Sequence, residues 1–362
     1  MPDVLLFGAT GYTGKLTAEA LAEEGVDFAI AGRNRSKLEE LAGRVGGPEI
    51  RVVSAGDVDG LTSASSDARV LITCVGPFIE LGDTAAEAAI RAGVHYIDST
   101  GESVFIRRLI ERYDDQARAA GIAMAPALGF DEVVADTAAT LATNGIERPD
   151  LVLTYAIPSS GSAGTVKSSL DIMAQPARFI ADGVPYRVEP GGSARWSPLP
   201  APLGPRLGVS IALGETQLAP LHIDLNGLAT YVSVGRGLRT ALRLGVPVLR
   251  AVGRNDLLRA KVRGLIDRGG EGPTDEQRAR SYFTILAEAR SGRAWRNVWL
   301  QGTDVYGLTA ATLVAGAKRS LEAGFGEKGV IAPVQALGME NAQKVLIDRG
   351  VTIESFGSEE GD

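Results

Sequence analysis

Short apolar runs alternate with segments of helical spacing over the first third of the chain. Each run is too short for a helix and is typical of a strand buried on both faces of a parallel sheet. The six runs cover residues 4–7, 27–31, 50–53, 70–75, 95–98 and 122–127. Six strand–helix units within residues 1–130 predict an α/β domain with a Rossmann-type, doubly wound parallel sheet.

The rhythm changes after residue 130. A helix over 133–143 and apolar stretches at 151–156, 229–234, 282–289 and 294–301 predict a second α+β domain over residues 131–328, with a mostly antiparallel sheet. Residues 183–220 are rich in proline and glycine, which predicts an excursion outside the core. A helix over 308–321 is expected to close this domain. We expect the C-terminal segment 329–357 to return to the first domain.

Three glycines stand between the first strand and the first helix. The first permits unusual backbone angles, the second lets the chain approach a pyrophosphate, and the third lets the helix lie against the strand. The helix N-terminus then offers free N–H groups to phosphates. A nucleoside-triphosphate loop is excluded, because Ala9 and Leu16 stand where it needs glycine and Ser or Thr. The predicted pyrophosphate turn is Gly8, Thr10, Gly11, Tyr12, Thr13 and Gly14.

Three cations follow the second strand, where an NAD site usually carries an acidic residue for the ribose hydroxyls. They are Arg33, Arg35 and Lys37, with Asn34 between the first two. Cations and amides at this point suit a 2′-phosphate, so the sequence predicts NADP(H) as cofactor. The plainer interpretation is a solvated loop whose Ser36 caps the next helix, and the two interpretations are compatible.

A sharp turn after the fourth strand predicts the next part of the cofactor site, because ligands of open α/β sheets lie at the carboxyl ends of strands. Its residues are Val75, Gly76, Pro77 and Phe78. Four further residues are candidates for catalysis, although none is identified as the general acid. Asp98 and Glu102 lie at the carboxyl end of the fifth strand, Asp131 follows the sixth, and Lys167 follows a small-residue loop at 159–165. Helix capping or a turn hydrogen bond is the alternative for Asp98 and Asp131.

Composition narrows the class of protein. The 362 residues suit two domains, and 45% hydrophobic with 22% charged residues is typical of a globular protein. The net charge of −7 argues against a nucleic-acid-binding protein. One cysteine and two histidines exclude an internal disulfide and a typical zinc site, so no metal is expected. No apolar run approaches the roughly 20 residues of a membrane span, and we expect a cytoplasmic protein.

A local excess of positive charge lies within this acidic chain. Residues 236–268 hold nine Lys or Arg against Asp256 and Asp267. The plain interpretation is a surface helix with a solvated basic face. The functional alternatives are a docking face for an acidic partner, such as a carrier domain that delivers an acyl chain, or peripheral contact with an anionic membrane.

Several of these segments together resemble the saccharopine-dehydrogenase-like oxidoreductases. Within that group the chain is most similar to the bacterial branch that includes trans-acting enoyl reductases. The resemblance rests on residues 8–14, 31–34, 75–78, 96–102, 129–131 and 332–338, which occur in family order. It implies a Rossmann domain that binds NADP, a second α+β domain over the nicotinamide, and a C-terminus that returns to the first domain. The chain departs from the family after Asp131, where a common proline is absent.

The acceptor of the hydride stays open between two chemistries. An enoyl reductase must stabilise an enolate, whereas a saccharopine-type enzyme acts on a C=N bond and needs cations for amino-acid carboxylates. The helix after the small-residue loop offers Lys167 alone, which favours an apolar or acyl substrate, either free or bound to a carrier. A short-chain dehydrogenase is excluded, since none of the eight tyrosines has lysine four residues on. A non-catalytic NADP-binding sensor remains the alternative to an enzyme. A homodimer is a possible oligomeric state.

Overall fold

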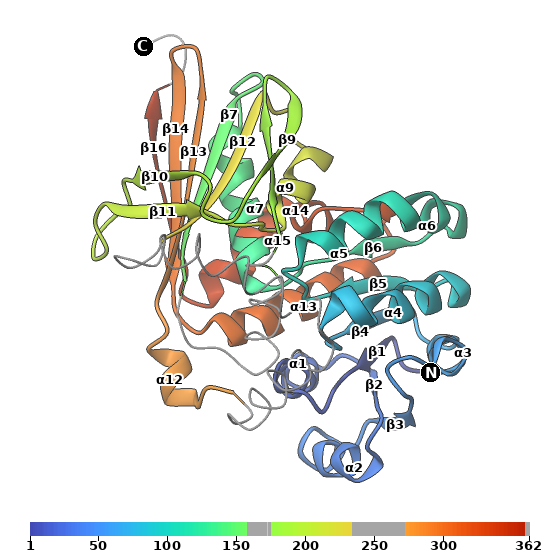
Figure 1. The fold of residues 1–362 in the computed structure, drawn as a ribbon. Helices are drawn as coiled ribbons and strands as arrows, with labels where there is room; N and C mark the ends of the chain where they lie inside the picture. The colour runs from blue at the N-terminus through green and yellow to red at the C-terminus, as the bar shows by residue number, and fades with distance from the viewer. Residues whose placement is uncertain (158–171, 173–174, 234–271, 359–362) are drawn as a thin grey trace, which may run out of the picture. The chain divides into compact units, whose positions relative to one another are not determined.

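The computed structural model describes residues 1–157, 172, 175–233 and 272–358, which fall into two compact units (Figure 1). The first unit comprises Met1–Val133 and Val305–Val345. The second comprises the described residues of Val134–Asp304 and Leu346–Asp362. The chain therefore leaves the first unit after Val133, returns to it at Val305, and enters the second unit again at Leu346.

Seven parallel strands form the sheet of the first unit, in the order β15-β6-β5-β4-β1-β2-β3. The strands are β1 (Val4–Phe7), β2 (Phe28–Gly32), β3 (Glu49–Val52), β4 (Val70–Thr73), β5 (His95–Asp98), β6 (Ala123–Ala125) and β15 (Gly329–Val330). The helices are α1 (Tyr12–Glu23), α2 (Arg35–Arg44), α3 (Val58–Ser65), α4 (Phe78–Ala92), α5 (Ser103–Arg108), η1 (Leu109–Tyr113), α6 (Asp114–Ala120), α13 (Val305–Leu321) and α14 (Pro333–Leu337). Two more helices, α7 (Phe130–Thr143) and α15 (Met339–Asp348), run from one unit into the other. The predicted doubly wound fold is confirmed.

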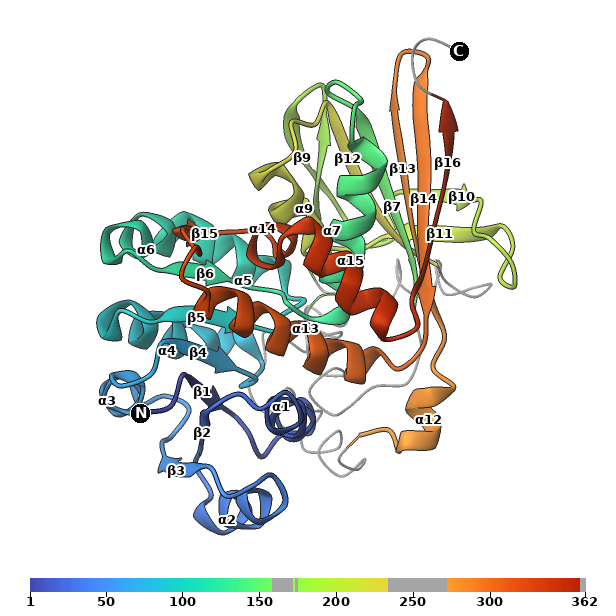
Figure 2. The same ribbon diagram turned by 180° about the vertical axis from the view of Figure 1, so that it is seen from behind.

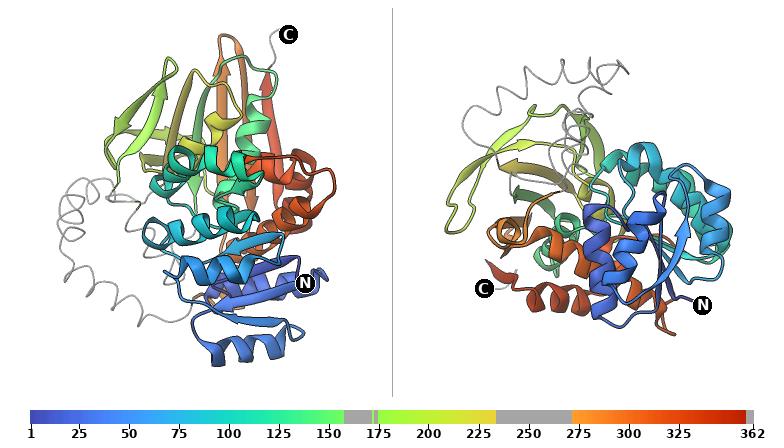
Figure 3. Two further views of the ribbon diagram at one scale, coloured as in Figure 1. Left: turned by 90° about the vertical axis from the view of Figure 1, so that its right-hand side faces the viewer. Right: turned by 90° about the horizontal axis from the view of Figure 1, so that it is seen from below.

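Helices cover both faces of this sheet, which explains why its central strands are apolar on both sides (Figure 3). All four residues of β1 are at most 2% exposed. Helix α1 packs beside α13, which comes from the far end of the chain, and α3 packs beside α4 (Figure 2). Because β1 lies between β4 and β2, the strand order reverses at β1, and the carboxyl ends of β1 and β4 form the switch point where such sheets bind ligands.

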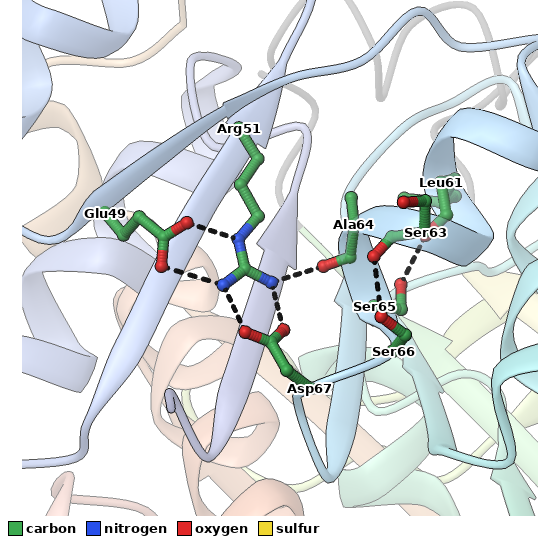
Figure 4. Close-up of polar contacts among 8 residues, drawn as sticks. All are labelled: Glu49, Arg51, Leu61, Ser63, Ala64, Ser65, Ser66 and Asp67. Carbon is green, nitrogen blue, oxygen red and sulfur yellow. Dashed lines mark hydrogen bonds and ion pairs between the residues drawn. The ribbon is translucent and has the colours of Figure 1, made fainter.

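The edge strand β3 is fixed by a near-buried arginine (Figure 4). The Arg51 guanidinium donates to Glu49 on its own strand and, over 2.9 Å, to Oδ2 of Asp67. It also donates to the main-chain oxygen of Ala64 at the end of α3. These bonds tie an otherwise open sheet edge to the loop between α3 and β4. The hydrogen bonds from Arg51, together with its positive charge, lower the pKa of both Glu49 and Asp67.

The helical stretch after β5 is interrupted. A five-residue π-helical turn, η1, separates α5 from α6. The turn directs Tyr113 inward, where its ring is 1% exposed. Its hydroxyl lies 3.1 Å from both Asp83 and Glu87 of α4. The π-helical turn contains one residue more per turn than an α-helix, and this extra residue occurs where Tyr113 packs against α4.

A mixed sheet organises the second unit. Its order is β10-β11-β12-β7-β13-β14-β16, with β8 paired to β12 and β9 paired to β8. The strands are β7 (Asp150–Ala156), β8 (Ala177–Ala181), β9 (Val184–Val188), β10 (Ala194–Ser197), β11 (Arg206–Ser210), β12 (Gly227–Ser233), β13 (Phe283–Ser291), β14 (Ala294–Gly302) and β16 (Thr352–Ser358); the described helices are α9 (Glu215–Leu218), η2 (Ala219–Leu221) and α12 (Asp275–Ala279). The predicted α+β class with a mostly antiparallel sheet is confirmed. One pair differs, because β12 runs parallel to β7.

The prediction that residues 183–220 lie outside the core is wrong. This stretch supplies β9, β10, β11, α9 and most of η2. Val209 and Leu218 in it are fully buried. Its glycines mark the turns between short strands: Gly183, Gly191 and Gly204 all have positive φ. A high density of turn residues therefore disguised a run of short sheet strands.

The predicted domain assignment of the C-terminal third also needs correction. Helix α13, which was placed in the second domain, belongs to the first unit, so the return begins at Val305 and not at residue 329. The last strand, β16, does not return to the first domain. It pairs antiparallel with β14 over seven residue pairs, which completes the edge of the second sheet. Both errors have the same cause. The periodicity of apolar residues predicts a strand or a helix, but it does not predict which other element that strand or helix packs against.

Candidate functional site

The glycine turn after β1 is held close to the turn after β4. Gly8 has φ +82°, and a side chain there would meet Val75 at 2.7 Å. A side chain at Gly14 would collide with the main-chain oxygen of Gly8. These two glycines therefore permit a tight strand–turn–helix connection that touches the neighbouring turn. The structure brings together two of the three predicted cofactor segments, residues 8–14 and 75–78.

Helix α1 begins without a side-chain cap. Its N-cap is Gly11, which is exposed, and its first turn holds no acidic residue. Two of the other helices that start at this edge of the sheet differ: Asn34 caps α2, and Glu102 reaches the start of α4. An uncapped helix terminus presents N–H groups and the positive end of the helix dipole. Among these three helices, α1 is the one suited to an anionic pyrophosphate.

The turn after β2 presents its cations to solvent. Arg33, Asn34 and Lys37 are all exposed, and neither Arg33 nor Lys37 forms an ion pair with any residue of the described ranges. The cap of α2 differs from the prediction. Asn34 Oδ1 accepts from the N–H of Lys37 at 3.1 Å and from the hydroxyl of Ser36 at 2.9 Å, so Asn34 and not Ser36 caps the helix. The capping fixes the loop, and the cations stay available for a phosphate.

The turn after β4 is closed by a carboxylate from another loop. Glu102 is 3% exposed. Its Oε1 accepts from the N–H of Phe78 at 3.0 Å and its Oε2 from the N–H of Ile79 at 2.7 Å. The Gly76–Pro77 peptide bond is cis, and the Phe78 ring stacks on Phe105 with centroids 5.9 Å apart. Glu102 therefore serves as the cap of α4.

Asp98 is fully buried and accepts three hydrogen bonds. Its Oδ1 accepts from the N–H groups of Thr100 and Ala127, each at 2.8 Å, and its Oδ2 accepts from the Tyr96 hydroxyl at 2.5 Å. Burial raises the pKa of Asp98 to about 6, although the three donors oppose the shift. Burial and the adjacent Asp98 charge raise the pKa of the Tyr96 hydroxyl well above its usual value. The turn-bond alternative describes Asp98 better than a role in proton transfer.

Ala127 marks backbone strain at the same edge. Its φ of +62° lies in the left-handed region, which a residue with a side chain rarely occupies, at a cost of about 1–3 kcal/mol. Asp98 accepts the Ala127 N–H, and the Asp98 main-chain oxygen accepts from Leu128 at 2.8 Å. Two hydrogen bonds to Asp98, the last residue of β5, thus hold the strained backbone at Ala127 and Leu128 in place.

Asp131 differs from the other two acids. It lies in the first turn of α7, is partly exposed, and sits against two glycines. Its Oδ1 would be 3.1 Å from a Cβ at Gly129, and its Oδ2 would be 3.4 Å from one at Gly101. Burial raises the pKa of Asp131, and the nearby main-chain N–H groups of α7 oppose that shift. Burial of the carboxylate thus favours its protonated form, although the residue as a whole keeps some exposure.

Two residues that sequence reasoning missed join this site. Thr100, which is 1% exposed, links Asp98 to Glu102 through its main-chain N–H and its Oγ1. Tyr306, at the start of α13, packs edge-on against Tyr12 of the glycine turn with centroids 4.8 Å apart. Thr100 lies inside the motif at 96–102 and could have been suspected. Tyr306 gave no sequence signal, because it lies almost 300 residues from its partner.

Several predicted features lie outside the described residues. They are Lys167, the small-residue loop at 159–165 and the basic segment 236–268. Within the described ranges, no group of three His, Cys, Asp or Glu side chains is arranged to hold a metal ion. The helices of the same ranges include none with the length and apolarity that a membrane crossing requires.

Known proteins are similar to this chain in sequence over the same residues that form the glycine turn and the neighbouring turns. The family model of the saccharopine dehydrogenase NADP binding domain matches residues 4–124. A Mycobacterium tuberculosis protein provisionally named a trans-acting enoyl reductase is 30% identical over 334 residues, which covers 78% of this chain and 79% of that protein. The trans-acting enoyl reductase of Mycobacterium leprae is 38% identical over 141 residues, covering 37% of this chain and 34% of the relative. A lipid droplet localized protein of Caenorhabditis elegans is 32% identical over 146 residues, with the same shares.

A solved structure supports the fold across both units. The apo saccharopine dehydrogenase (L-Glu forming) of Saccharomyces cerevisiae matches with a TM-score of 0.67 at 13% identity. The match covers 99% of this chain and all of that one. The likeness is one of architecture, because an identity this low carries no information about substrate.

Proposed function

Because the chain belongs to the saccharopine-dehydrogenase-like oxidoreductases and carries their NADP-binding domain, we propose that it reduces the C=C bond of an enoyl thioester with NADPH. The observation that carries the proposal is the uncapped N-terminus of α1 beside the glycine turn, within the residues that match the family model. A bound nicotinamide supplies the hydride, and the protein supplies orientation and electrostatics.

The cofactor residues divide into three tasks. The residues of the glycine turn, Gly8, Thr10, Gly11, Tyr12, Thr13 and Gly14, would hold the pyrophosphate. Arg33 and Lys37, with Asn34, would bind the 2′-phosphate, since both cations are exposed and neither has an ion pair among the described residues. Val75, Gly76, Pro77 and Phe78 would line the nicotinamide half, because their turn touches the glycine turn at Gly8.

The choice of cofactor has a direct test. Charge-assisted hydrogen bonds to a phosphate contribute about 1.5–3 kcal/mol, so we expect NADPH to bind at least about tenfold more tightly than NADH. Arg33→Ala should remove most of that preference by weakening NADPH alone. The matched control is Arg44→Ala, an exposed cation at the other end of α2, which should leave both affinities unchanged. Equal affinities of the wild-type protein for the two cofactors, measured by fluorescence titration, would refute the assignment.

The enoyl acceptor is favoured by two observations. The two mycobacterial relatives are named trans-acting enoyl reductases, one of them provisionally. At the carboxyl ends of β5 and β6, the described chain gathers the acids Asp98, Glu102 and Asp131, and these would repel the carboxylates of an amino-acid substrate. NADPH oxidation should therefore be faster with crotonyl-CoA than with a 2-oxo acid plus an amine. The opposite order would favour C=N chemistry, and oxidation with neither would favour a sensor.

We assign Asp131 the role of proton donor to the α-carbon of the substrate. A general acid must be accessible and must be protonated in part near neutral pH. Asp131 is partly exposed as a residue, and burial of its carboxylate raises its pKa, which favours the protonated form, whereas Asp98 and Glu102 bridge main-chain N–H groups of separate loops. Asp131→Asn should lower kcat by about 10²–10⁴-fold with little change in NADPH affinity. A variant with normal kcat would remove Asp131 from the chemistry.

The substrate is proposed to arrive on a carrier domain in the cytoplasm. The word "trans-acting" in the names of the relatives fits an acyl chain that a separate protein delivers. Carrier domains are generally acidic, and residues 236–268 supply the matching positive charge. The lipid-droplet name of the worm relative supports the alternative of a lipid surface, which a vesicle-binding assay would distinguish.

A further inference from the structure

Glu102 joins two loops that the sequence keeps apart. Its two carboxylate oxygens accept one N–H each from Phe78 and Ile79, which precede it by 24 and 23 residues. The side chain is almost fully buried. An ionised carboxylate accepts hydrogen bonds and donates none. With one N–H on each oxygen, Glu102 is committed to the first turn of α4.

A buried chain of hydrogen bonds extends this contact across three strands. The N–H of Glu102 donates to Thr100 Oγ1 at 3.1 Å, and the N–H of Thr100 donates to Asp98 Oδ1. The same Asp98 oxygen accepts from Ala127 after β6. The carboxyl ends of β4, β5 and β6 are therefore connected through side chains that are at most 3% exposed.

We infer that Glu102 is a positioning residue for hydride transfer, which holds the turn at 76–78 in one arrangement against the nicotinamide half of the cofactor. This role rests on the proposed function. The turn adjoins the glycine turn, because Gly8 and Val75 are in contact. The residues proposed to hold the pyrophosphate and the 2′-phosphate lie on other loops, so loss of Glu102 should affect the orientation of the nicotinamide more than the affinity for NADPH. The residue acts through the main chain and does not touch the reacting atoms.

The requirement for a carboxylate gives a sharp variant. Two N–H donors need two acceptors, and Glu102→Gln replaces one acceptor with an NH₂ group that faces an N–H. Thr100→Val removes a neighbouring bond while it keeps the carboxylate, and should give a weaker effect of the same kind. The matched control is Asp114→Asn in the same unit. Asp114 also accepts a main-chain N–H, from Val330 at 2.6 Å, but at the end of the sheet where β15 begins.

Hydrogen exchange tests the contact itself. In Glu102→Gln the amides of Phe78 and Ile79 should exchange at least tenfold faster than in the wild-type protein, and in Asp114→Asn they should not change. Circular dichroism melting establishes that each variant is folded. Unchanged exchange at both amides in Glu102→Gln would overturn the inference, regardless of the affinity of that variant for NADPH.

Cofactor and turnover measurements test the consequence. Glu102→Gln should bind NADPH within about threefold of wild type, while the emission of the bound nicotinamide moves toward that of free NADPH and single-turnover oxidation by crotonyl-CoA slows at least tenfold. Asp114→Asn should match wild type in both. Normal emission and rate in Glu102→Gln would overturn the positioning role alone. A wild-type protein that fails to bind NADPH would overturn the proposed function, and this role with it.

Discussion

Replacing Asp98 by asparagine should change how stability depends on pH. The folded-state pKa of Asp98 is about 6, against an ordinary value of 3.8. A raised pKa means that the folded protein binds the proton more tightly than the unfolded chain does. The resulting stabilisation is fully present below about pH 4 and is lost as the pH rises through 6. Asparagine keeps the shape and an acceptor oxygen for the N–H groups of Thr100 and Ala127, and it does not titrate.

The magnitude follows from the difference between the two pKa values. A difference of about 2.2 corresponds to about 3 kcal/mol of unfolding free energy. Because Asp98 is fully buried, solvent screening does not reduce this figure. The free energy of unfolding of Asp98→Asn, relative to wild type, should therefore rise by about 3 kcal/mol between pH 3.5 and pH 8.

Urea denaturation at half-unit pH intervals measures the effect. The variant is compared with wild type at each pH, so the opposite trends of Glu49 and Asp67 cancel in the difference. NADPH affinity and turnover should stay within a few fold of wild type, because Asp98 holds the backbone. A difference that does not vary with pH would refute the raised pKa. A loss of turnover at unchanged stability would instead identify Asp98 as a proton donor.

Three further outcomes are expected. Gly11→Val should abolish NADPH binding at an unchanged melting temperature, since Gly11 is exposed and has extended backbone angles. Gly14→Val should instead unfold the first unit, because its side chain would collide with the main chain of Gly8. Normal NADPH binding by Gly11→Val would show that the pyrophosphate loop is wrongly assigned. Asp67→Asn should cost about 1 kcal/mol or less near neutral pH, because hydrogen bonds from Arg51 lower the pKa of Asp67 and the pair is partly exposed. The cost should shrink as the pH falls below 3.8, the ordinary pKa of Asp, and a cost that does not fall in acid, measured by denaturation, would contradict this. Reversal of Arg259, Lys261 and Arg263 to glutamate should slow turnover of a carrier-bound acyl substrate but not of a free thioester. Added salt should produce part of the same effect in the wild-type protein. Unaltered turnover of the carrier-bound substrate in this variant would show that the basic segment does not dock a carrier.

Local signals in the sequence were sufficient for the cofactor half of the site. The glycine turn, the cations after β2 and the turn at 75–78 are each encoded within about seven residues. A strand that ends in such a turn has few alternatives, because backbone sterics and helix-terminus electrostatics act over that same distance. The parallel sheet followed from apolar runs that are buried on both faces.

The roles of the acids were decided only by tertiary structure. Asp98, Glu102 and Asp131 look equivalent in the sequence, since each lies at or just past the end of a strand. The fold brings Ala127 to Asp98 across 29 residues and Phe78 to Glu102 across 24, which occupies both side chains. The Asp131 carboxylate instead lies against Gly101 and Gly129, and burial there raises its pKa. No periodicity records which main-chain N–H groups a distant carboxylate will meet.

The second unit shows the same division. Its class could be read from apolar alternation, but the partners of its strands could not. The pairing of β16 with β14, the parallel alignment of β12 with β7 and the return of α13 to the first unit all join segments far apart in the chain. The sequence specifies which face of each element must be buried, because that depends on the spacing of its own side chains. Which element buries it is settled by competition among all apolar faces at once, and that competition is resolved only in the folded protein.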